Sequence, residues 1–145
     1  MRTQVCIIGG GPSGLLLSQL LHRKGIDTIV LERKTRDYVL GRIRAGILEV
    51  GFVNLMREAG VSERMDRESF THDGTLISYD DEMFGINFVE HTGTPVVVYG
   101  QTEVTRDLYD AREAMDGQIV FNVEDVVINN AETDAPHVTD RKSVV

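Results

Sequence analysis

The chain has 145 residues, of which 41% are hydrophobic and 26% charged, so it is long enough to form one globular domain with a buried core. The formal net charge of −8 argues against a general nucleic-acid-binding surface, because such surfaces are basic. The single cysteine, Cys6, excludes an intramolecular disulfide and favours a reducing, cytoplasmic location. We expect no membrane association, because the N-terminus lacks a signal-peptide pattern and no apolar run is long enough to cross a bilayer.

The first 32 residues predict a strand, a glycine-rich turn, a helix and a second strand. Residues 4–8 form a short apolar run that is typical of a buried parallel strand. A helix is expected over 13–24, followed by Gly25, and a second buried strand over 28–31. The apolar stripe of that helix is predicted to be Leu16, Leu17, Leu20 and Leu21.

The turn has the pattern Gly9-x-Gly11-x-x-Gly14, which predicts binding of the ADP half of a dinucleotide. The three glycines allow a tight turn, a close approach of a pyrophosphate, and packing of the helix against the sheet. Ser13 adds a hydroxyl at the helix N-terminus, and Glu32 follows the second strand, where a carboxylate can accept hydrogen bonds from the adenosine ribose. This unit alone is compatible with NAD or FAD, and the alternative is a glycine turn without a ligand.

Residues 33–46 are predicted to form a long polar connection. Arg42 and Arg44 flank one residue in it, so in extended backbone their side chains point the same way. They are either part of a solvated basic loop or contacts for an anionic cofactor at the carboxyl ends of the parallel strands.

The central part of the chain predicts a helix over 48–59, ended by Gly60, and then a segment with a period of two. In that segment Asp73-Gly74 is a turn signal, and the alternating residues of one strand face are predicted to be Phe84, Ile86 and Phe88. A further strand is expected over 96–99.

An amphipathic helix should follow Gly100, with Thr102 as its N-cap and one face made by Val104, Leu108, Ala111 and Met115. Gln101, at the junction before this helix, either contacts a cofactor or caps the helix. Residues 119–128 predict one or two strands, 129–136 a polar turn, and 137 onward another strand, with 143–145 resembling an interrupted strand.

Three segments carry a resemblance to a known family: Gly9–Gly14, Tyr38–Gly46 and Val98–Leu108. Together they resemble the N-terminal part of the 4-hydroxybenzoate 3-monooxygenase family of flavin-dependent aromatic hydroxylases. The resemblance implies an α/β, Rossmann-like FAD-binding fold with an inserted antiparallel β segment at about 66–98. It also implies that residues 1–145 are the truncated N-terminal portion of that FAD-binding domain.

The resemblance further implies two cofactors, FAD and NADPH. FAD would be contacted by Ser13, Glu32, Gln101 and the stretch Arg42, Ile43, Arg44, Ala45, Gly46 and Ile47. The phosphates of NADPH would be bound by Arg33, Lys34, Tyr38, Arg42 and Arg44. No catalytic residue and no metal ligand is predicted in this chain.

The activity implied for the whole protein is NADPH- and O₂-dependent conversion of 4-hydroxybenzoate to 3,4-dihydroxybenzoate, by a full-length homodimer. The chain by itself is expected to be inactive and to bind flavin weakly or not at all. Two alternatives stay open: a non-catalytic dinucleotide-binding fragment, and a different FAD-dependent reductase or dehydrogenase that shares only the ADP-binding unit.

Overall fold

The computed structural model describes residues 1–141, and the strand predicted at 143–145 lies outside them. The chain divides into two compact units. The first unit comprises Met1–Arg42 and Thr105–Val145, and the second comprises Ile43–Val104. Helices and strands occur in both units, which agrees with the predicted α/β class.

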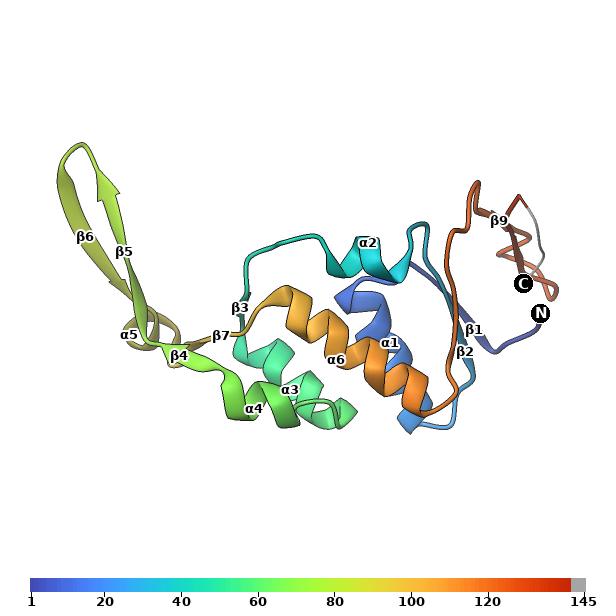
Figure 1. Cartoon of the computed structure of the whole chain (residues 1–145), viewed down its shortest axis with the longest axis horizontal. Helices are drawn as coiled ribbons and strands as arrows, with labels where there is room; N and C mark the ends of the chain where they lie inside the picture. Colours follow the sequence, from blue (N-terminus) through green and yellow to red (C-terminus); the bar gives the residue numbers. More distant parts are fainter. Residues whose placement is uncertain (142–145) are drawn as a thin grey trace. The chain divides into compact units, whose positions relative to one another are not determined.

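A parallel sheet of three strands organises the first unit. Its order is β1 (Val5–Ile8), β2 (Thr28–Leu31) and β8 (Gln118–Val120), with Val5 opposite Thr28. Helix α1 (Pro12–Arg23) connects β1 to β2 and packs on both strands (Figure 1). All four residues of β2 are buried, as a parallel strand covered on its faces requires. The strand–turn–helix–strand prediction is therefore confirmed.

The buried face of α1 differs in part from the predicted stripe. Leu16 is buried as expected, but Leu17 is 47% exposed, and Leu15 is buried in its place. The buried face also includes Ser18, whose hydroxyl donates to Leu15 O at 2.7 Å and so has a partner away from water. The prediction placed the buried face in a wrong rotational position on the helix, because it was assigned from the leucines alone and did not include a buried serine. Leu20 and Leu21 are half-buried.

A short helix, α2 (Arg36–Leu40), interrupts the connection that was predicted to be irregular. Thr35 caps it, since the Thr35 hydroxyl oxygen accepts a hydrogen bond from the Tyr38 N–H at 3.1 Å. Five residues without an apolar period give no helical signal, so the threonine cap was the only local indication that the sequence offered.

Helix α6 (Gln101–Ala114) begins one residue before the predicted cap. Gly100 O accepts from the N–H groups of Glu103 and Val104 at 2.9 and 3.0 Å, so Gly100 lies at the helix start and Thr102 lies inside the first turn. The prediction of Thr102 as N-cap is wrong. The predicted face is confirmed at Val104 and Leu108, which are each 1% exposed.

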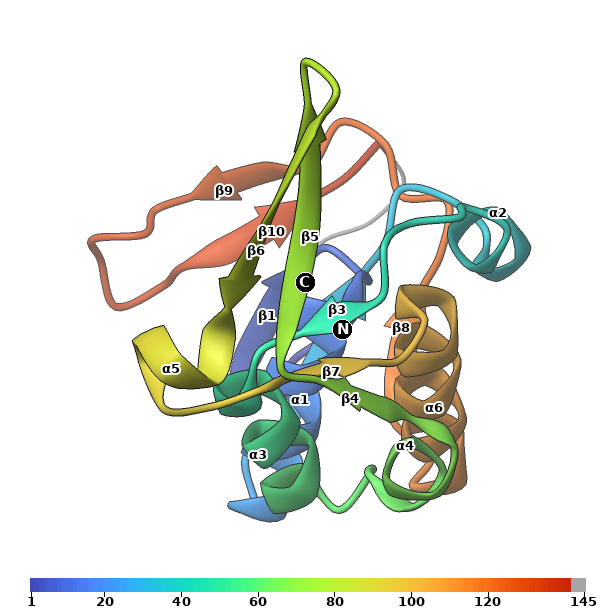
Figure 2. The ribbon, with the colours of Figure 1, turned by 90° about the vertical axis from the view of Figure 1, so that its left-hand side faces the viewer.

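The C-terminal part of the first unit adds an antiparallel pair, β9 (Val127–Asn129) and β10 (His137–Thr139), seen in Figure 2. Both strands and the intervening polar turn match the sequence prediction. Val138 packs in a cluster with Ile29, Leu31 and Val123, and Cys6 lies against that cluster. Burial raises the pKa of the Cys6 thiol, which is consistent with an unreactive core residue.

The second unit contains a three-stranded antiparallel sheet, and its helices include α3 (Val50–Ala59) and α4 (Glu63–Glu68). The sheet order is β3 (Ile47–Leu48), β7 (Val96–Val98) and β4 (Phe70–His72). Helix α3 ends at Gly60 as predicted, where the backbone adopts a left-handed φ of 73°, and α4 follows. The core of these helices is formed by Val53, Met56, Ala59 and Met65.

A two-stranded hairpin of β5 (Gly74–Tyr79) and β6 (Glu82–Asn87) completes the second unit, followed by helix α5 (Phe88–Thr92). The predicted turn at Asp73-Gly74 separates two strands, but these belong to different sheets. The hairpin turn is Asp80-Asp81, whose φ angles of 50° and 62° suit a two-residue turn of the left-handed type. Phe88 begins α5, so the predicted alternation of the strand ends at Ile86.

Candidate dinucleotide-binding site

The glycine turn between β1 and α1 depends on each of its motif glycines for a different reason. Gly9 has a φ of +118°, and its N–H donates to Leu31 O at 2.8 Å. A Cβ on Gly14 would lie 2.0 Å from Gly9 O, so a side chain there would drive the helix away from the turn. Among the described residues, no heavy atom lies within 4 Å of the position that a Cβ on Gly11 would take. The backbone at Gly11 is therefore open to a close-lying ligand.

Glu32 follows β2 and closes on the same turn. One carboxylate oxygen, Oε2, accepts from the Gly10 N–H at 2.8 Å, and the other, Oε1, accepts from the Lys34 N–H at 2.8 Å. Each oxygen retains a further lone pair, so the carboxylate is held in place and can still accept hydrogen bonds. Its close packing also explains Gly10, which the motif left undefined: a Cβ there would lie 2.9 Å from the Glu32 Cβ.

Tyr109 of α6 is a site residue that sequence reasoning missed. Its hydroxyl donates to Gly10 O at 2.8 Å, and its side chain is only 1% exposed. Burial and the charge of Glu32 raise the pKa of Tyr109 to about 12, against a smaller opposing effect of Arg36, so the phenol keeps its proton over the physiological range. No local motif marks this tyrosine, because its partner is 99 positions away in the sequence.

A basic cluster surrounds the exposed ring of Tyr38. The Lys34 Nζ lies 5.2 Å and the Arg42 Cζ 5.8 Å from the ring centroid. Within residues 1–141 neither cation has a carboxylate partner, whereas Arg36 pairs with Asp110 at 2.6 Å. Arg33, the neighbour of Lys34 in the sequence, is exposed. The cluster therefore offers positive charge that no side chain in the described part of the chain neutralises.

The remaining predicted residues lie in the second unit. Gly46 packs against the start of α6: its O accepts from the Tyr99 N–H at 2.8 Å, and a Cβ on it would lie 2.6 Å from the Gly100 Cα. The structure thus brings the predicted loop and the Gln101 junction together. The other loop residues are exposed in the described chain: Ile43, Arg44, Ala45 and Ile47. The predicted site residues consequently form two sets, one in each unit.

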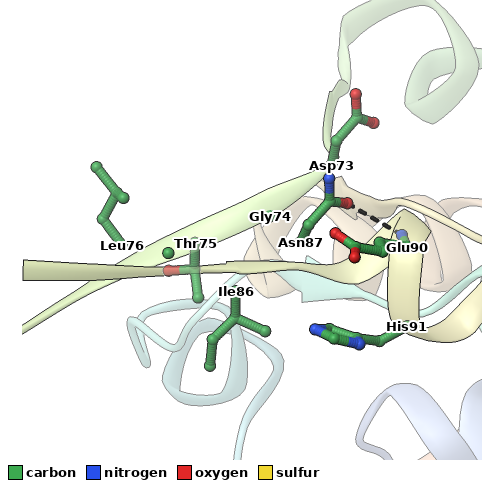
Figure 3. Close-up of a pocket in the computed structure, with 9 residues that line it drawn as sticks. Asp73, Gly74, Thr75, Leu76, Ile86, Asn87, Glu90 and His91 are labelled. Carbon is green, nitrogen blue, oxygen red and sulfur yellow. Dashed lines mark hydrogen bonds between the residues drawn. The ribbon is translucent and has the colours of Figure 1, made fainter.

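A hollow of about 450 Å³ at the base of the hairpin is a further candidate site in the second unit (Figure 3). Two polar groups of its lining bond the start of α5: Asn87 Oδ1 accepts from the Glu90 N–H at 3.1 Å, and the backbone oxygen of Asp73 accepts from the Phe88 N–H at 2.6 Å. No group of three or more potential metal-ligating side chains occurs among residues 1–141. We therefore interpret this hollow as a product of helix capping.

The donor set of the first unit fits an adenosine diphosphate group. The first turn of a helix offers N–H groups that have no intrahelical acceptor, and Ser13 and Gly14 lie in that turn behind the open backbone of Gly11. Glu32 provides an oriented anionic acceptor for hydroxyl groups.

Searched over residues 1–141, the helices include none with the length and apolar character that a membrane span needs.

Comparison with curated proteins identifies relatives that share most of this chain. It is 44% identical over 140 residues to p-hydroxybenzoate hydroxylase of Acinetobacter baylyi, which covers 96% of the chain and 34% of the relative. It is 33% identical over 115 residues to the FAD-dependent monooxygenase subE of Metarhizium robertsii, which covers 74% of the chain and 35% of the relative. The chain thus spans about a third of the length of these relatives. The resemblance inferred from the three sequence segments is confirmed.

Solved structures show the same fold at lower identity. PqsL of Pseudomonas aeruginosa superposes with a TM-score of 0.80 at 18% identity, covering 98% of this chain and 40% of that one. For 2-methyl-3-hydroxypyridine-5-carboxylic acid oxygenase the TM-score is 0.79 at 18% identity, covering 100% of this chain and 37% of that one. The model of the FAD binding domain family matches residues 2–144. The chain therefore belongs to the FAD binding domain family.

Proposed function

We propose that this chain is the FAD-binding portion of an NADPH-dependent monooxygenase that hydroxylates 4-hydroxybenzoate to 3,4-dihydroxybenzoate. The observation that carries the proposal is the glycine turn with its fixed carboxylate, in a chain 44% identical to a p-hydroxybenzoate hydroxylase. Bound FAD supplies the redox and oxygen chemistry of such an enzyme. The residues of this chain bind and orient the cofactor.

Each part of the first unit has a distinct role in this proposal. Glu32 accepts hydrogen bonds from the ribose hydroxyls, since its carboxylate is already oriented by two backbone N–H groups. The N–H groups at Gly11 and Ser13 take the pyrophosphate, helped by the positive end of the α1 dipole. In the second unit the loop from Ile43 to Ile47 and Gln101 extend the cofactor contacts.

The basic cluster around Tyr38 is proposed to bind the phosphates of NADPH. Lys34 and Arg42 lie over the Tyr38 ring, and within residues 1–141 neither has a carboxylate partner. Arg33 and Arg44 add exposed charge. A phosphate oxygen placed beside Lys34 and Arg42 would gain charge-assisted hydrogen bonds.

Binding of adenine nucleotides by the chain tests the ADP site. We expect Glu32→Gln to weaken FAD or ADP binding by about 1–3 kcal/mol, because one anionic acceptor is lost. The matched control is Glu58→Gln, an exposed carboxylate in α3, which should leave affinity unchanged. Equal affinities of the wild type and Glu32→Gln would remove Glu32 from the ribose site.

The proposed hydroxylase activity is tested on the longest protein that the coding region encodes. That protein should consume NADPH and O₂ in the presence of 4-hydroxybenzoate and release 3,4-dihydroxybenzoate. Lys34→Ala should lower kcat/KM for NADPH by about tenfold, the loss expected for one charge-assisted contact of about 1.4 kcal/mol. Flavin reduction without hydroxylation would favour a reductase or dehydrogenase, and nucleotide binding without either reaction would favour a non-catalytic module.

A further inference from the structure

The glycine turn is held by two residues that act on consecutive peptide groups. The N–H of the Gly9–Gly10 peptide donates to Glu32, and the carbonyl of the Gly10–Gly11 peptide accepts from the Tyr109 hydroxyl, each at 2.8 Å. The second of these peptides also contains the N–H of Gly11. Because a trans peptide is planar, its C=O and N–H point in opposite directions, so fixing one fixes the other.

We propose that Tyr109 is a positioning residue for the diphosphate of the bound nucleotide, acting through the Gly10–Gly11 peptide. Its hydroxyl holds the Gly10 carbonyl and so fixes the direction of the Gly11 N–H, and among the described residues no heavy atom lies within 4 Å of the position that a Cβ on Gly11 would take. A carbonyl that accepts a hydrogen bond is also polarised, which makes the N–H of the same peptide a stronger donor. This inference rests on the proposed function, because the ligand is the ADP portion of FAD.

Tyr109 is itself held rigidly enough for this role. Its ring centroid lies 5.8 Å from that of Phe121 with the planes tilted by 48°, and the Arg36 guanidinium carbon lies 5.5 Å from the Tyr109 ring. Arg36 is tied in turn to Asp110 at 2.6 Å. Helix α6 therefore delivers the hydroxyl to Gly10 from a buried and braced side chain. The high pKa of Tyr109 keeps the hydroxyl proton in place for donation.

The test uses Tyr109→Phe, which removes the hydroxyl and keeps the ring. We expect affinity for ADP to fall by about threefold to tenfold, the range for one neutral hydrogen bond, while affinity for adenosine is unchanged. The matched control, Tyr79→Phe on the exposed hairpin, should change neither. A general loss of structure would weaken both ligands, so an equal loss of ADP and adenosine binding would overturn the positioning role.

A readout without ligand separates this inference from the proposed function. In ¹H–¹⁵N spectra of the apo chain, the Gly11 amide resonance should move in Tyr109→Phe and stay in place in Tyr79→Phe. In the wild type, the Tyr109 hydroxyl proton should exchange slowly with water, a result that does not depend on how the variant folds. An unmoved Gly11 amide or a rapidly exchanging hydroxyl would overturn the inference. Failure of the wild type to bind ADP or adenosine would count against the proposed function and against a nucleotide as the ligand, whereas an unmoved Gly11 amide in a chain that binds ADP would count against the role of Tyr109 alone.

Discussion

The glycine turn of the first unit and the β5–β6 hairpin of the second differ in how completely each is supported by its own unit. The turn contacts Glu32 and Tyr109, which are 22 and 99 positions from Gly10 in sequence. The hairpin is held by its own ladder, and its side chains at Leu76 and Tyr79 are 69% and 77% exposed. A lone two-stranded hairpin is only marginally stable in water.

The comparison shows that, of these two elements, the one fixed by contacts with distant residues is the better supported, although it has no regular secondary structure. The irregular turn is the better-determined element, because polar groups on two distant segments fix its peptides. The hairpin has regular hydrogen bonds and a suitable turn, but it buries little apolar surface. Five substitutions and one change of pH would sharpen or break this comparison.

The largest effect is expected for Gly14→Ala in the turn. The new Cβ would meet Gly9 O at 2.0 Å, a backbone atom that cannot move without opening the turn, so the free energy of unfolding should fall by more than about 4 kcal/mol. The control is Gly11→Ala, which has room for a methyl group and a φ of −81° that alanine adopts readily. It should change stability by less than about 0.5 kcal/mol but weaken ADP binding, as measured by urea denaturation and titration calorimetry.

The core of the second unit should respond strongly as well. Met56 is fully buried on α3, and Met56→Ala should lower the free energy of unfolding of that unit by about 3 kcal/mol through lost burial and a residual cavity. Chemical denaturation followed by circular dichroism would measure the change. A loss below about 1 kcal/mol would mean that the helices of this unit are not the source of its stability.

An alkaline titration should reveal the buried phenol. Below pH 10 both folded and unfolded chains keep the Tyr109 proton. Between pH 10 and about 12 the unfolded chain loses the proton while the folded chain retains it, so stability falls as the pH rises. We expect this tyrosine to account for about 2 kcal/mol of the loss. Denaturation midpoints of wild type and Tyr109→Phe between pH 9 and 12 would isolate that share, and parallel curves would contradict it.

The smallest effect is expected on the hairpin. Met83 is 66% exposed, so Met83→Ala should alter the free energy of unfolding by less than about 0.5 kcal/mol. It is the counterpart of Met56→Ala, with the same atoms removed from a side chain that lacks packing. If Met56→Ala and Met83→Ala lower the free energy of unfolding equally, then Met83 is covered in solution by a contact that the described structure does not contain.

The sequence allowed the local units to be predicted where spacing and chemistry coincide. The turn from Gly9 to Gly14, the buried strand before Glu32 and the helix stop at Gly60 all follow from short-range rules. The short α2 helix, the exposure of Leu17 and the position of the hairpin turn did not. The α2 helix depends on a single threonine cap, the exposure of Leu17 on a buried serine, and the hairpin turn on two consecutive aspartates. Each of these features is a weaker predictor than the hydrophobic pattern.

The candidate site shows the same division. The motif indicated Gly9, Gly11 and Glu32 but not Tyr109, whose contribution depends on where α6 delivers its side chain. Nor did spacing explain why residue 10 is glycine, which follows only from the packing of Glu32. Long-range hydrogen bonds to backbone atoms leave no pattern in one sequence.

The bond between Glu32 and the Gly10 N–H changes how an acidic residue at this position should be interpreted across related genes. The carboxylate accepts a hydrogen bond from within the protein, and a residue without an acceptor at position 32 would leave the buried Gly10 N–H without a partner. Selection would then preserve the acid in a lineage that had lost every nucleotide ligand. A related protein that retains Glu32 but has alanine at position 11 would keep the fold of the turn without binding a nucleotide. Positions 11 and 32 read together therefore separate retention of the fold from retention of nucleotide binding better than either position does alone.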